Sequence, residues 1–523
     1  KQVAEVLLFY KQGGQREFTS KPMSSAGNGV YAATLGISEI SNTGINYYIR
    51  AFDGVNFSYD PARDWQEKPH NIAVRIIGEN NQGLAKASPQ PAGNLQTAFR
   101  MISVPLNAER PGASDILEDD LGTYDPKKWR LFQFNPTTNN YREFPNIDLM
   151  TPGKAFWLIV RDQNKRLDSG VGKTVATNQP FQLTLRKGWN DIGIPFNFSV
   201  QWNQVQVIKG DKDSVIGPYT YRGEWLLPDQ VSILEPWEGY SIYSNADNVI
   251  IAIPPFAFTS TIPSTVTQKL NSEVEWFINI QAICQQARDG FNRLGVAQQA
   301  RTQWDRYDYL EPPPVGEYVS VRFPHEDWQQ FNGFFATDFR PVFKDGMIWD
   351  FQVETNIKNA EVSLIFEKLE KKKKKYEVVL LDLQTLQQIN LRKTPKYTFL
   401  PDQQTLIRNF QLVTGTADFI DKSDVVQKSI PRNFALHQNY PNPFNASTVI
   451  SYEIPRQSLV TITVFNILGQ KIRLLLSQVQ KPGFYRVTWD GKSDQGQDMS
   501  TGVYLIQLNA QNFRFTRKAV LIR

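Results

Sequence analysis

The chain has 523 residues, of which 41% are hydrophobic and 12% aromatic, so it is too apolar to be disordered and too long for one hydrophobic core. Its net charge of +5 is small for this length and the charged residues are dispersed, which excludes a typical nucleic-acid-binding protein. No apolar run is long enough to form a transmembrane helix. The abundance of Phe, Tyr and turn residues predicts an all-β protein of tandem β-sandwich domains.

Residues 1–78 predict a β-domain, with alternating strands at 3–10, 29–33 and 45–53. This pattern resembles the immunoglobulin-like or fibronectin-like modules of bacterial secreted proteins. In those modules one or two strands precede the first strand seen here, so the resemblance implies a partial immunoglobulin-like domain. We expect the strand at 3–10 to have an open neighbour. The missing strand would come from an upstream part of the same polypeptide or from a neighbouring copy.

Residues 79–95 have the composition of a linker, and residues 96–256 then contain an internal repeat. Each copy has a strand ending in proline, aromatic strands, and a Pro/Gly turn leading into another aromatic strand. We therefore expect one duplicated, aromatic-rich β-domain. Its Trp and Tyr side chains could stack on sugar rings, as in a carbohydrate-binding module. The alternative is that four tryptophans pack in the core: Trp129, Trp157, Trp189 and Trp225.

We expect a second linker at residues 257–265, another β-sandwich at residues 266–416 and a third linker at residues 417–432. The only cysteine, Cys284, lies in an apolar run and is expected to be a buried core residue. Lys371 to Lys375 form a run of like charge. We interpret it either as a contact for an acidic polysaccharide or as the solvated tip of a hairpin between the strands at 362–366 and 376–381.

The chain lacks the usual constellations of catalytic residues. Its histidines are His70, His325 and His437, and none has a second histidine or a cysteine at metal-ligand spacing. Neither a Gly-x-Ser-x-Gly elbow nor a phosphate-binding loop is present. We therefore predict a non-catalytic chain with no cofactor. Ca²⁺ is a weak candidate at one group of acidic residues, which comprises Asp289, Asp305, Asp308 and Glu311.

Residues 433–523 predict a small β-sandwich of their own. Val460, Ile462 and Val464 alternate with polar residues or aromatics, and the run ends in a turn at Leu468 and Gly469. A second alternating strand ends at Trp489, before a turn at Asp490 and Gly491.

Four motifs in this segment, in this order, closely resemble the C-terminal sorting domain of type IX secretion substrates from Bacteroidetes and related phyla. The motifs are Asn-Tyr-Pro-Asn-Pro-Phe-Asn, Leu-Gly-Gln, a hairpin ending in Trp-Asp-Gly, and Gly-Val-Tyr. The residues that carry the resemblance are Asn439, Tyr440, Pro441, Asn442, Pro443, Phe444, Asn445, Leu468, Gly469, Trp489, Asp490, Gly491, Gly502, Val503 and Tyr504.

The resemblance implies a secreted protein at the bacterial cell surface or outside the cell, with the outer-membrane type IX export machinery as its partner. The upstream β-domains would then be spacer, adhesion or assembly modules. Because the chain begins at Lys1 without a signal peptide, we expect it to be part of a longer polypeptide. Two alternatives stay open: the accessory tail of a secreted hydrolase such as a subtilisin-like protease, and a set of carbohydrate-binding modules.

Overall fold

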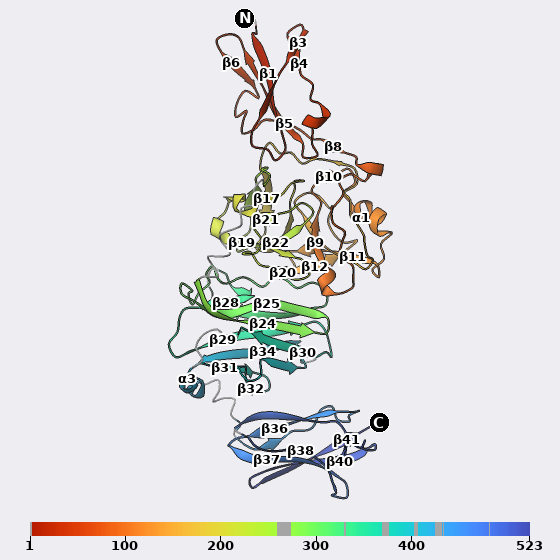
Figure 1. Cartoon of the computed structure of the whole chain (residues 1–523), viewed down its shortest axis with the longest axis vertical. Helices are drawn as coiled ribbons and strands as arrows, with labels where there is room; N and C mark the ends of the chain where they lie inside the picture. Colours follow the sequence, from red (N-terminus) through yellow and green to blue (C-terminus); the bar gives the residue numbers. More distant parts are fainter. Residues whose placement is uncertain are drawn as a thin grey trace.

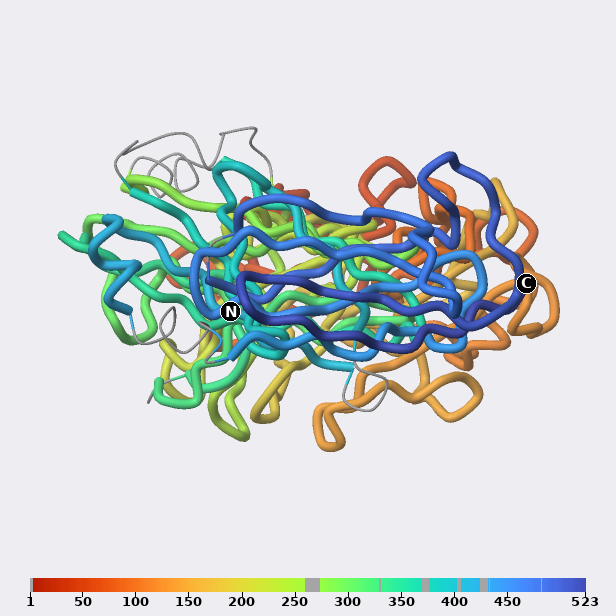
Figure 2. The backbone as a smooth tube through the Cα atoms, turned by 90° about the horizontal axis from the view of Figure 1, so that it is seen from below, coloured from red at the N-terminus to blue at the C-terminus, as the bar shows by residue number. Residues whose placement is uncertain are grey.

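The computed structural model describes residues 3–258, 273–328, 331–368, 376–401, 406–423, 431, 433–480 and 482–523. The chain is an all-β protein of tandem β-sandwich domains, stacked along one long axis from the N-terminus to the C-terminus (Figure 1). Figure 2 views the molecule from below, where the strands of residues 433–523 lie across its end. Among the described residues, no helix is long and apolar enough to cross a membrane.

The N-terminal unit is built on one five-stranded sheet and a separate hairpin. The sheet has the order β2-β1-β5-β6, with β7 also pairing with β5. Strand β1 is therefore paired on both sides, with β2 and with β5, and the open neighbour expected for residues 3–10 is wrong. The short β2, which periodicity did not reveal, fills that position. The strands are β1 (Glu5–Gln12), β2 (Thr19–Pro22), β3 (Ser24–Gly27), β4 (Val30–Ala32), β5 (Ile45–Phe52), β6 (Phe57–Asp60) and β7 (His70–Ile72).

The second unit contains two four-stranded sheets with the same strand order, as an internal duplication would produce. One runs β12-β11-β13-β9 and the other β20-β19-β22-β16. The copies exchange equivalent contacts, because Ile102 bridges to Glu238 and Lys154 bridges to Ile192. The strands are β9 (Arg100–Ser103), β11 (Trp129–Asn135), β12 (Asn140–Glu143), β13 (Ala155–Val160), β16 (Gly188–Gly193), β19 (Val215–Tyr221), β20 (Trp225–Leu226) and β22 (Gly239–Ser244).

Smaller elements complete the second unit. Helix α1 (Ala113–Leu121) buries its apolar side in the first copy. Three small sheets have the orders β10-β14-β8, β15-β23-β18 and β17-β21. Their strands are β8 (Arg75–Ile76), β10 (Asn107–Ala108), β14 (Gly172–Lys173), β15 (Phe181–Leu185), β17 (Val200–Gln201), β18 (Gln206–Lys209), β21 (Ile233–Leu234) and β23 (Val249–Ile253).

The segment 79–95, predicted to be a linker, is packed along the second unit. Gly83 bridges to Gly170, Ala85 to Asp168 and Ala92 to Val160. The Gly, Ala and Pro residues that made this segment read as a linker also let its backbone approach a neighbouring chain segment closely. A side chain at position 83 would collide with the carbonyl of Gly170.

The third unit is a sandwich of a five-stranded and a six-stranded sheet. The first sheet has the order β28-β25-β24-β30-β33 and the second β27-β26-β29-β34-β31-β32. The strands are β24 (Val274–Cys284), β25 (Ala287–Ala297), β26 (Val319–His325), β27 (Gly333–Phe335), β28 (Thr337–Arg340), β29 (Gly346–Thr355), β30 (Val362–Glu367), β31 (Glu377–Asp382), β32 (Gln387–Asn390), β33 (Lys396–Phe399) and β34 (Ile407–Gly415).

Three sequence predictions meet the structure in this unit. Cys284 is fully buried and free, as predicted. Strands β30 and β31 belong to different sheets, so the hairpin predicted between them is wrong: β30 lies between β24 and β33, and β31 lies between β34 and β32. Lys371 to Lys375 lie outside the described residues. The start of the predicted third linker is helix α3 (Ala417–Lys422), and Ile420 of this helix is buried.

The second and third units share one hydrophobic cluster. Phe134, Trp189 and Tyr219 of the second unit belong to the same buried cluster as the sandwich residues of the third. The hydroxyl of Tyr141 also donates a hydrogen bond to the carbonyl of Pro313, over 3.2 Å. The continuous core favours these two units behaving as one body. Most of residues 257–265, the linker predicted between them, lie outside the described chain.

The C-terminal unit is a sandwich with a hydrophobic core of its own. A three-stranded sheet of order β35-β36-β39 faces a four-stranded sheet of order β38-β37-β40-β41. Alternation in β37 places Val460, Ile462 and Val464 in the core, as the sequence predicted. The strands are β35 (Ala435–Leu436), β36 (Thr448–Ile454), β37 (Ser458–Asn466), β38 (Lys471–Gln480), β39 (Gly483–Trp489), β40 (Gly502–Ala510) and β41 (Phe513–Leu521).

Candidate functional site

The motif residues of the C-terminal unit gather at one end of its sandwich, although they are spread over much of the segment. Asn466 pairs with Tyr504 across β37 and β40, and Thr448 pairs with Trp489 across β36 and β39. Contact between the rings of Trp489 and Tyr504 places the motif strands of both sheets at the same end. We call this region the motif end, and it consists of residues 439–449, 466–470, 489–504 and 519–523.

Asn439 connects the first motif to the start of β36 by hydrogen bonding. Its side chain is buried, and Nδ2 donates to Thr448 Oγ1 over 3.0 Å. The Thr448 hydroxyl donates in turn to the carbonyl of Pro441 over 2.8 Å. Tyr440 exchanges two backbone hydrogen bonds with Val449, each 2.9 Å long, while its side chain is 67% exposed. Asn439 therefore fixes the loop, and the Tyr440 ring faces solvent.

Asn442 acts in place of a neighbouring strand at the edge of β41. Its Nδ2 donates to the Lys518 carbonyl over 3.2 Å, and its Oδ1 accepts from the Val520 amide over 2.7 Å. Backbone pairing continues where the Phe444 amide donates to Val520 and the Ile522 amide donates to Phe444, both over 2.9 Å. An uncovered sheet edge offers unpaired backbone groups to other chains. The first motif covers this part of the edge.

An aromatic row connects three of the motifs in the core of this end. The rings of Phe444 and Trp489 lie 5.4 Å apart between centroids, and those of Trp489 and Tyr504 lie 5.1 Å apart in an edge-on arrangement. All three side chains are at most 4% exposed. The polar tips are also satisfied: Trp489 Nε1 donates to the Lys492 carbonyl and the Tyr504 hydroxyl donates to the Ser500 carbonyl.

The Leu-Gly-Gln motif forms a rigid turn that presents apolar side chains to solvent. Gly469 has a φ of 76°, which favours glycine. Asn466 Oδ1 accepts hydrogen bonds from the amides of Leu468 and Gln470, at 3.0 and 2.9 Å. Ile467 and Leu468 project from this turn and are 71% and 77% exposed.

The remaining motif residues shape the end of the chain. Gly491 has a φ of 69° in the turn after β39, and its carbonyl accepts a hydrogen bond from Arg523. Asp490 accepts from the Lys492 amide over 3.1 Å. Gly502 opens β40, and Val503 pairs with Val520 near the end of β41. Pro441, Pro443 and Asn445 are exposed in the first motif.

Sequence reasoning missed the residues that join the motifs together. Thr448 receives the Asn439 side chain, and Arg523 contacts Asp498 over 2.7 Å as well as Gly491. Local patterns could not single out these residues, because their partners lie in other motifs. A polar Thr at an inward-facing position of a hydrophobic strand is the one signal that pointed to Thr448.

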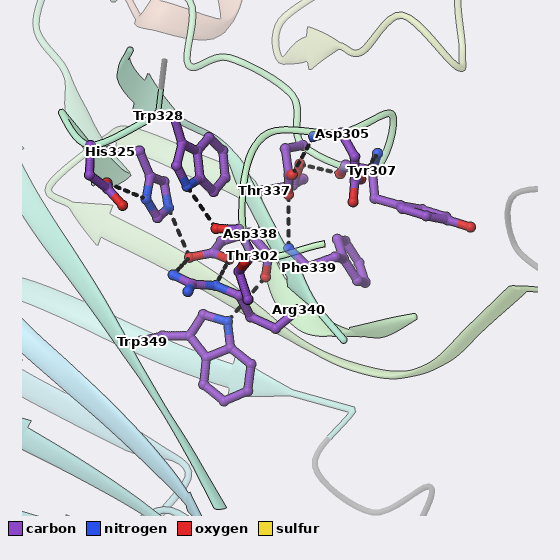
Figure 3. A network of polar contacts seen from close by, with 12 residues as sticks. Thr302, Asp305, Tyr307, His325, Trp328, Thr337, Asp338, Phe339, Arg340 and Trp349 are labelled. Carbon is purple, nitrogen blue, oxygen red and sulfur yellow. Dashed lines mark hydrogen bonds and ion pairs between the residues drawn. The ribbon is translucent and has the colours of Figure 1, made fainter. Parts of the chain in front are cut away.

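His325 is the one histidine buried among charged groups, but it is part of a packed network (Figure 3). Its ring stacks on Trp328, with centroids 3.6 Å apart, and Nε2 contacts Asp338 Oδ2 over 2.9 Å. Arg340 also binds Asp338 through two nitrogens, over 2.5 and 2.8 Å. Burial by itself raises the pKa of Asp338, but the hydrogen bonds from His325 and Arg340 outweigh it and hold this pKa below its ordinary value.

The hydrogen-bond and ion-pair partners of His325 are carboxylates: Asp338, and Asp327 at 3.6 Å. A hydrolase base of the Ser-His-Asp type instead has a hydroxyl or thiol nucleophile within hydrogen-bonding reach of one ring nitrogen. The network therefore has the form of a structural ion-pair cluster.

The four candidate calcium ligands occupy two separate arrangements. Asp305 and Asp308 accept hydrogen bonds from backbone amides of their own loop, and Asp308 also accepts from the Phe339 amide. Asp289 accepts from the Val321 amide and Glu311 from the Ser320 hydroxyl. The described residues contain no group of three or more His, Cys, Asp or Glu side chains that could hold a metal ion.

The tryptophans of the second unit serve its packing. Trp129, Trp157 and Trp189 are at most 7% exposed, and Trp225 is half-buried against Trp157, with ring centroids 5.4 Å apart. Trp157 Nε1 donates to Asp191 in the other copy over 2.9 Å. The core interpretation is therefore confirmed for Trp129, Trp157 and Trp189, and Trp225 packs against Trp157.

Residues 444–513 match the FlgD Ig-like domain family. No curated protein matches the chain. Among solved structures, dimeric latent PorU from Porphyromonas gingivalis matches at 10% identity and a TM-score of 0.16, over 69% of this chain and 36% of that one. PorZ, described as an essential surface component of the type-IX secretion system of the same organism, matches at 12% identity and a TM-score of 0.15, over 97% of this chain and 62% of that one.

The chain thus spans about a third of the PorU chain and less than two thirds of the PorZ chain. The family match places the immunoglobulin-like fold in the C-terminal unit and covers most of the motif end, from Phe444 through Tyr504.

Proposed function

We propose that residues 433–523 are a sorting signal for type IX secretion, and that the upstream β-domains are a non-catalytic part of a secreted or cell-surface protein. The observation that carries this proposal is the convergence of four separated motifs at one end of one sandwich. Motifs that only terminated strands would be expected at both ends of the domain. Here they meet at a single end.

The separate core of the C-terminal unit supports the same proposal. A sorting signal has to be recognised on cargo of different sizes, so it needs a fold that does not depend on the preceding domains. The buried cluster of this unit contains only residues from Phe434 to Leu521. We take the outer-membrane type IX export machinery as the partner that recognises this unit, because of the motif resemblance.

A spacer, adhesion or assembly role for residues 3–423 rests on their architecture. The described units are stacked lengthwise, and the second and third are joined by a continuous core (Figure 1). Such a stack would hold whatever lies at its N-terminal end away from the C-terminal unit. The packed arrangement of His325 supports the absence of catalysis from this chain.

A fusion experiment tests the sorting role. Residues 433–523 are attached to a reporter that carries a signal peptide, and the fusion is produced in a host with type IX secretion and in the same host lacking that system. We expect the reporter on the surface or in the medium of the first host only. An intact fusion that stays in the periplasm of both hosts would contradict the proposal.

A further inference from the structure

The motif residues fall into two groups that have different relations to the core. Asn439, Phe444, Trp489 and Tyr504 are at most 5% exposed and build the domain. Leu468, in contrast, is 77% exposed although it belongs to the motif pattern. Folding explains the first group. A large aliphatic side chain that contributes almost nothing to the core needs another explanation, since its exposure to water is unfavourable.

The turn that carries Leu468 is held rigid by its own hydrogen bonds. Besides the two bonds accepted by Asn466 Oδ1, the Asn466 side chain donates to Gln470 Oε1 over 2.7 Å, and the Gly469 amide donates to the Asn466 carbonyl. Ile467 is exposed beside Leu468. A fixed backbone loses little conformational freedom on binding, so the two side chains are pre-organised as contact residues.

Polar groups surround this apolar tip. Lys471 pairs with Asp494 over 3.1 Å, and the Arg473 guanidinium donates to the Ser493 carbonyl over 2.7 Å. An apolar centre with a polar rim is the usual anatomy of a protein–protein contact.

We propose that Ile467 and Leu468 are the anchor by which the C-terminal unit inserts into an apolar pocket of a protein of the export machinery. This inference rests on the proposed sorting function and assigns its contact surface. A protein pocket fits better than a lipid bilayer. The two side chains together hold fewer carbons than one myristoyl chain, which by itself gives only marginal membrane binding.

The same sandwich offers a matched control at its opposite end. Leu459 and Val479 face each other across β37 and β38 and are 59% and 62% exposed. They present two aliphatic side chains on β37 and β38, the two strands that the Ile467–Leu468 turn connects, but far from the motif end. A general effect of surface hydrophobicity would therefore appear equally in both pairs.

The test uses the full chain with a signal peptide ahead of it, in a host with type IX secretion. The variants are Ile467→Ser with Leu468→Ser, Ile467→Lys with Leu468→Lys, and the control Leu459→Ser with Val479→Ser. Thermal unfolding of each purified chain should match that of the parent, because all four side chains are exposed. We expect both tip variants to lose export at least about tenfold, while the control is exported like the parent.

Normal export of the tip variants would overturn this inference and leave the sorting role intact. Failure of the parent chain to be exported would overturn the sorting role and this inference with it. Binding of the parent to phosphatidylethanolamine–phosphatidylglycerol vesicles, abolished in the tip variants, would assign the tip to a membrane and would also overturn the inference.

Discussion

The side chain of Asn442 accepts a hydrogen bond from the backbone amide of Val520 over 2.7 Å, and so takes the place of a strand at the edge of β41. The same side chain donates to the Lys518 carbonyl. An amide side chain can pair in both directions as a peptide group does, whereas a carboxylate can only accept. This relationship gives one of the two buried or half-buried asparagines of the first motif a defined structural task.

Replacing Asn442 should therefore loosen the C-terminal edge. We expect Asn442→Ala to lower the free energy of unfolding of the C-terminal unit by about 1–2 kcal/mol, because the Val520 amide loses its partner and the Lys518 carbonyl keeps only the hydrogen bond from Gln438. Asn442→Asp should also destabilise, since it can no longer donate to Lys518. Hydrogen exchange at the Val520 amide is the direct measurement. Exchange as slow as in the parent would contradict this role, and the exposed Asn445→Ala is the matched control.

The aromatic row should carry much of the stability of the motif end. Trp489 is fully buried between Phe444 and Tyr504. We expect Trp489→Ala to cost about 3–5 kcal/mol, through lost burial and the cavity left behind. Tyr440→Ala should cost less than about 0.5 kcal/mol, because that ring is 67% exposed. Urea unfolding of the two variants measures the difference, and equal losses would contradict the packing described here.

His325 should matter for stability and not for turnover. Its removal leaves Arg340 as the remaining side chain that donates hydrogen bonds to the fully buried Asp338. We expect His325→Gln to lower the free energy of unfolding by about 1–3 kcal/mol. The parent chain should hydrolyse neither casein nor p-nitrophenyl esters. Hydrolysis by the parent that disappears in His325→Gln or His70→Gln would show that the chain is an enzyme.

Asp289 and Glu311 line a pocket together with Tyr221 and Trp225 of the second unit. This pair of carboxyls should make the stability of the interface between the second and third units sensitive to pH. Burial raises the pKa of Asp289 to about 6, and burial together with the charge of Asp289 raises the pKa of Glu311. A carboxyl whose pKa is higher in the folded than in the unfolded state stabilises the fold at low pH. This stabilisation is complete below the unfolded pKa of about 4 and is lost as the pH rises through about 6.

Asp289→Asn should therefore remove much of this pH dependence. We expect the variant to be more stable than the parent by about 1–2 kcal/mol at pH 7.5, and to lose that advantage near pH 4. Calorimetric unfolding at both pH values measures it. The exposed Asp418→Asn serves as the control. An advantage that is unchanged between the two pH values would contradict the assigned cause.

Much of the fold followed from local sequence patterns. The alternation of Val460, Ile462 and Val464 predicted an inward face, and the apolar run around Cys284 predicted burial. Both depend on side chains only a few residues apart. The hairpin around Lys371 to Lys375 was wrong because consecutive strands in a sandwich can join different sheets, which a local pattern does not reveal.

The motif end was predictable as a set of residues but not as an arrangement. Trp489 and Tyr504 were evident from the motifs, whereas their edge-on contact depends on two different sheets meeting. The pairing of Asn442 with Val520 joins segments that are distant in the chain, and no spacing rule connects them. The open neighbour predicted for β1 was wrong for a similar reason. Its second neighbour, β2, is a short strand of mostly polar and exposed residues, which a periodicity pattern does not reveal.

The most direct measurement of the central claim is the cellular location of the full chain in a host with type IX secretion. The chain is produced behind a signal peptide, complete or ending at residue 432, and the outer surface, the medium and the periplasm are assayed separately. We predict that the complete chain reaches the surface or the medium and that the shortened chain stays in the periplasm. Equal export of the two chains would contradict the assignment of residues 433–523 as the sorting signal.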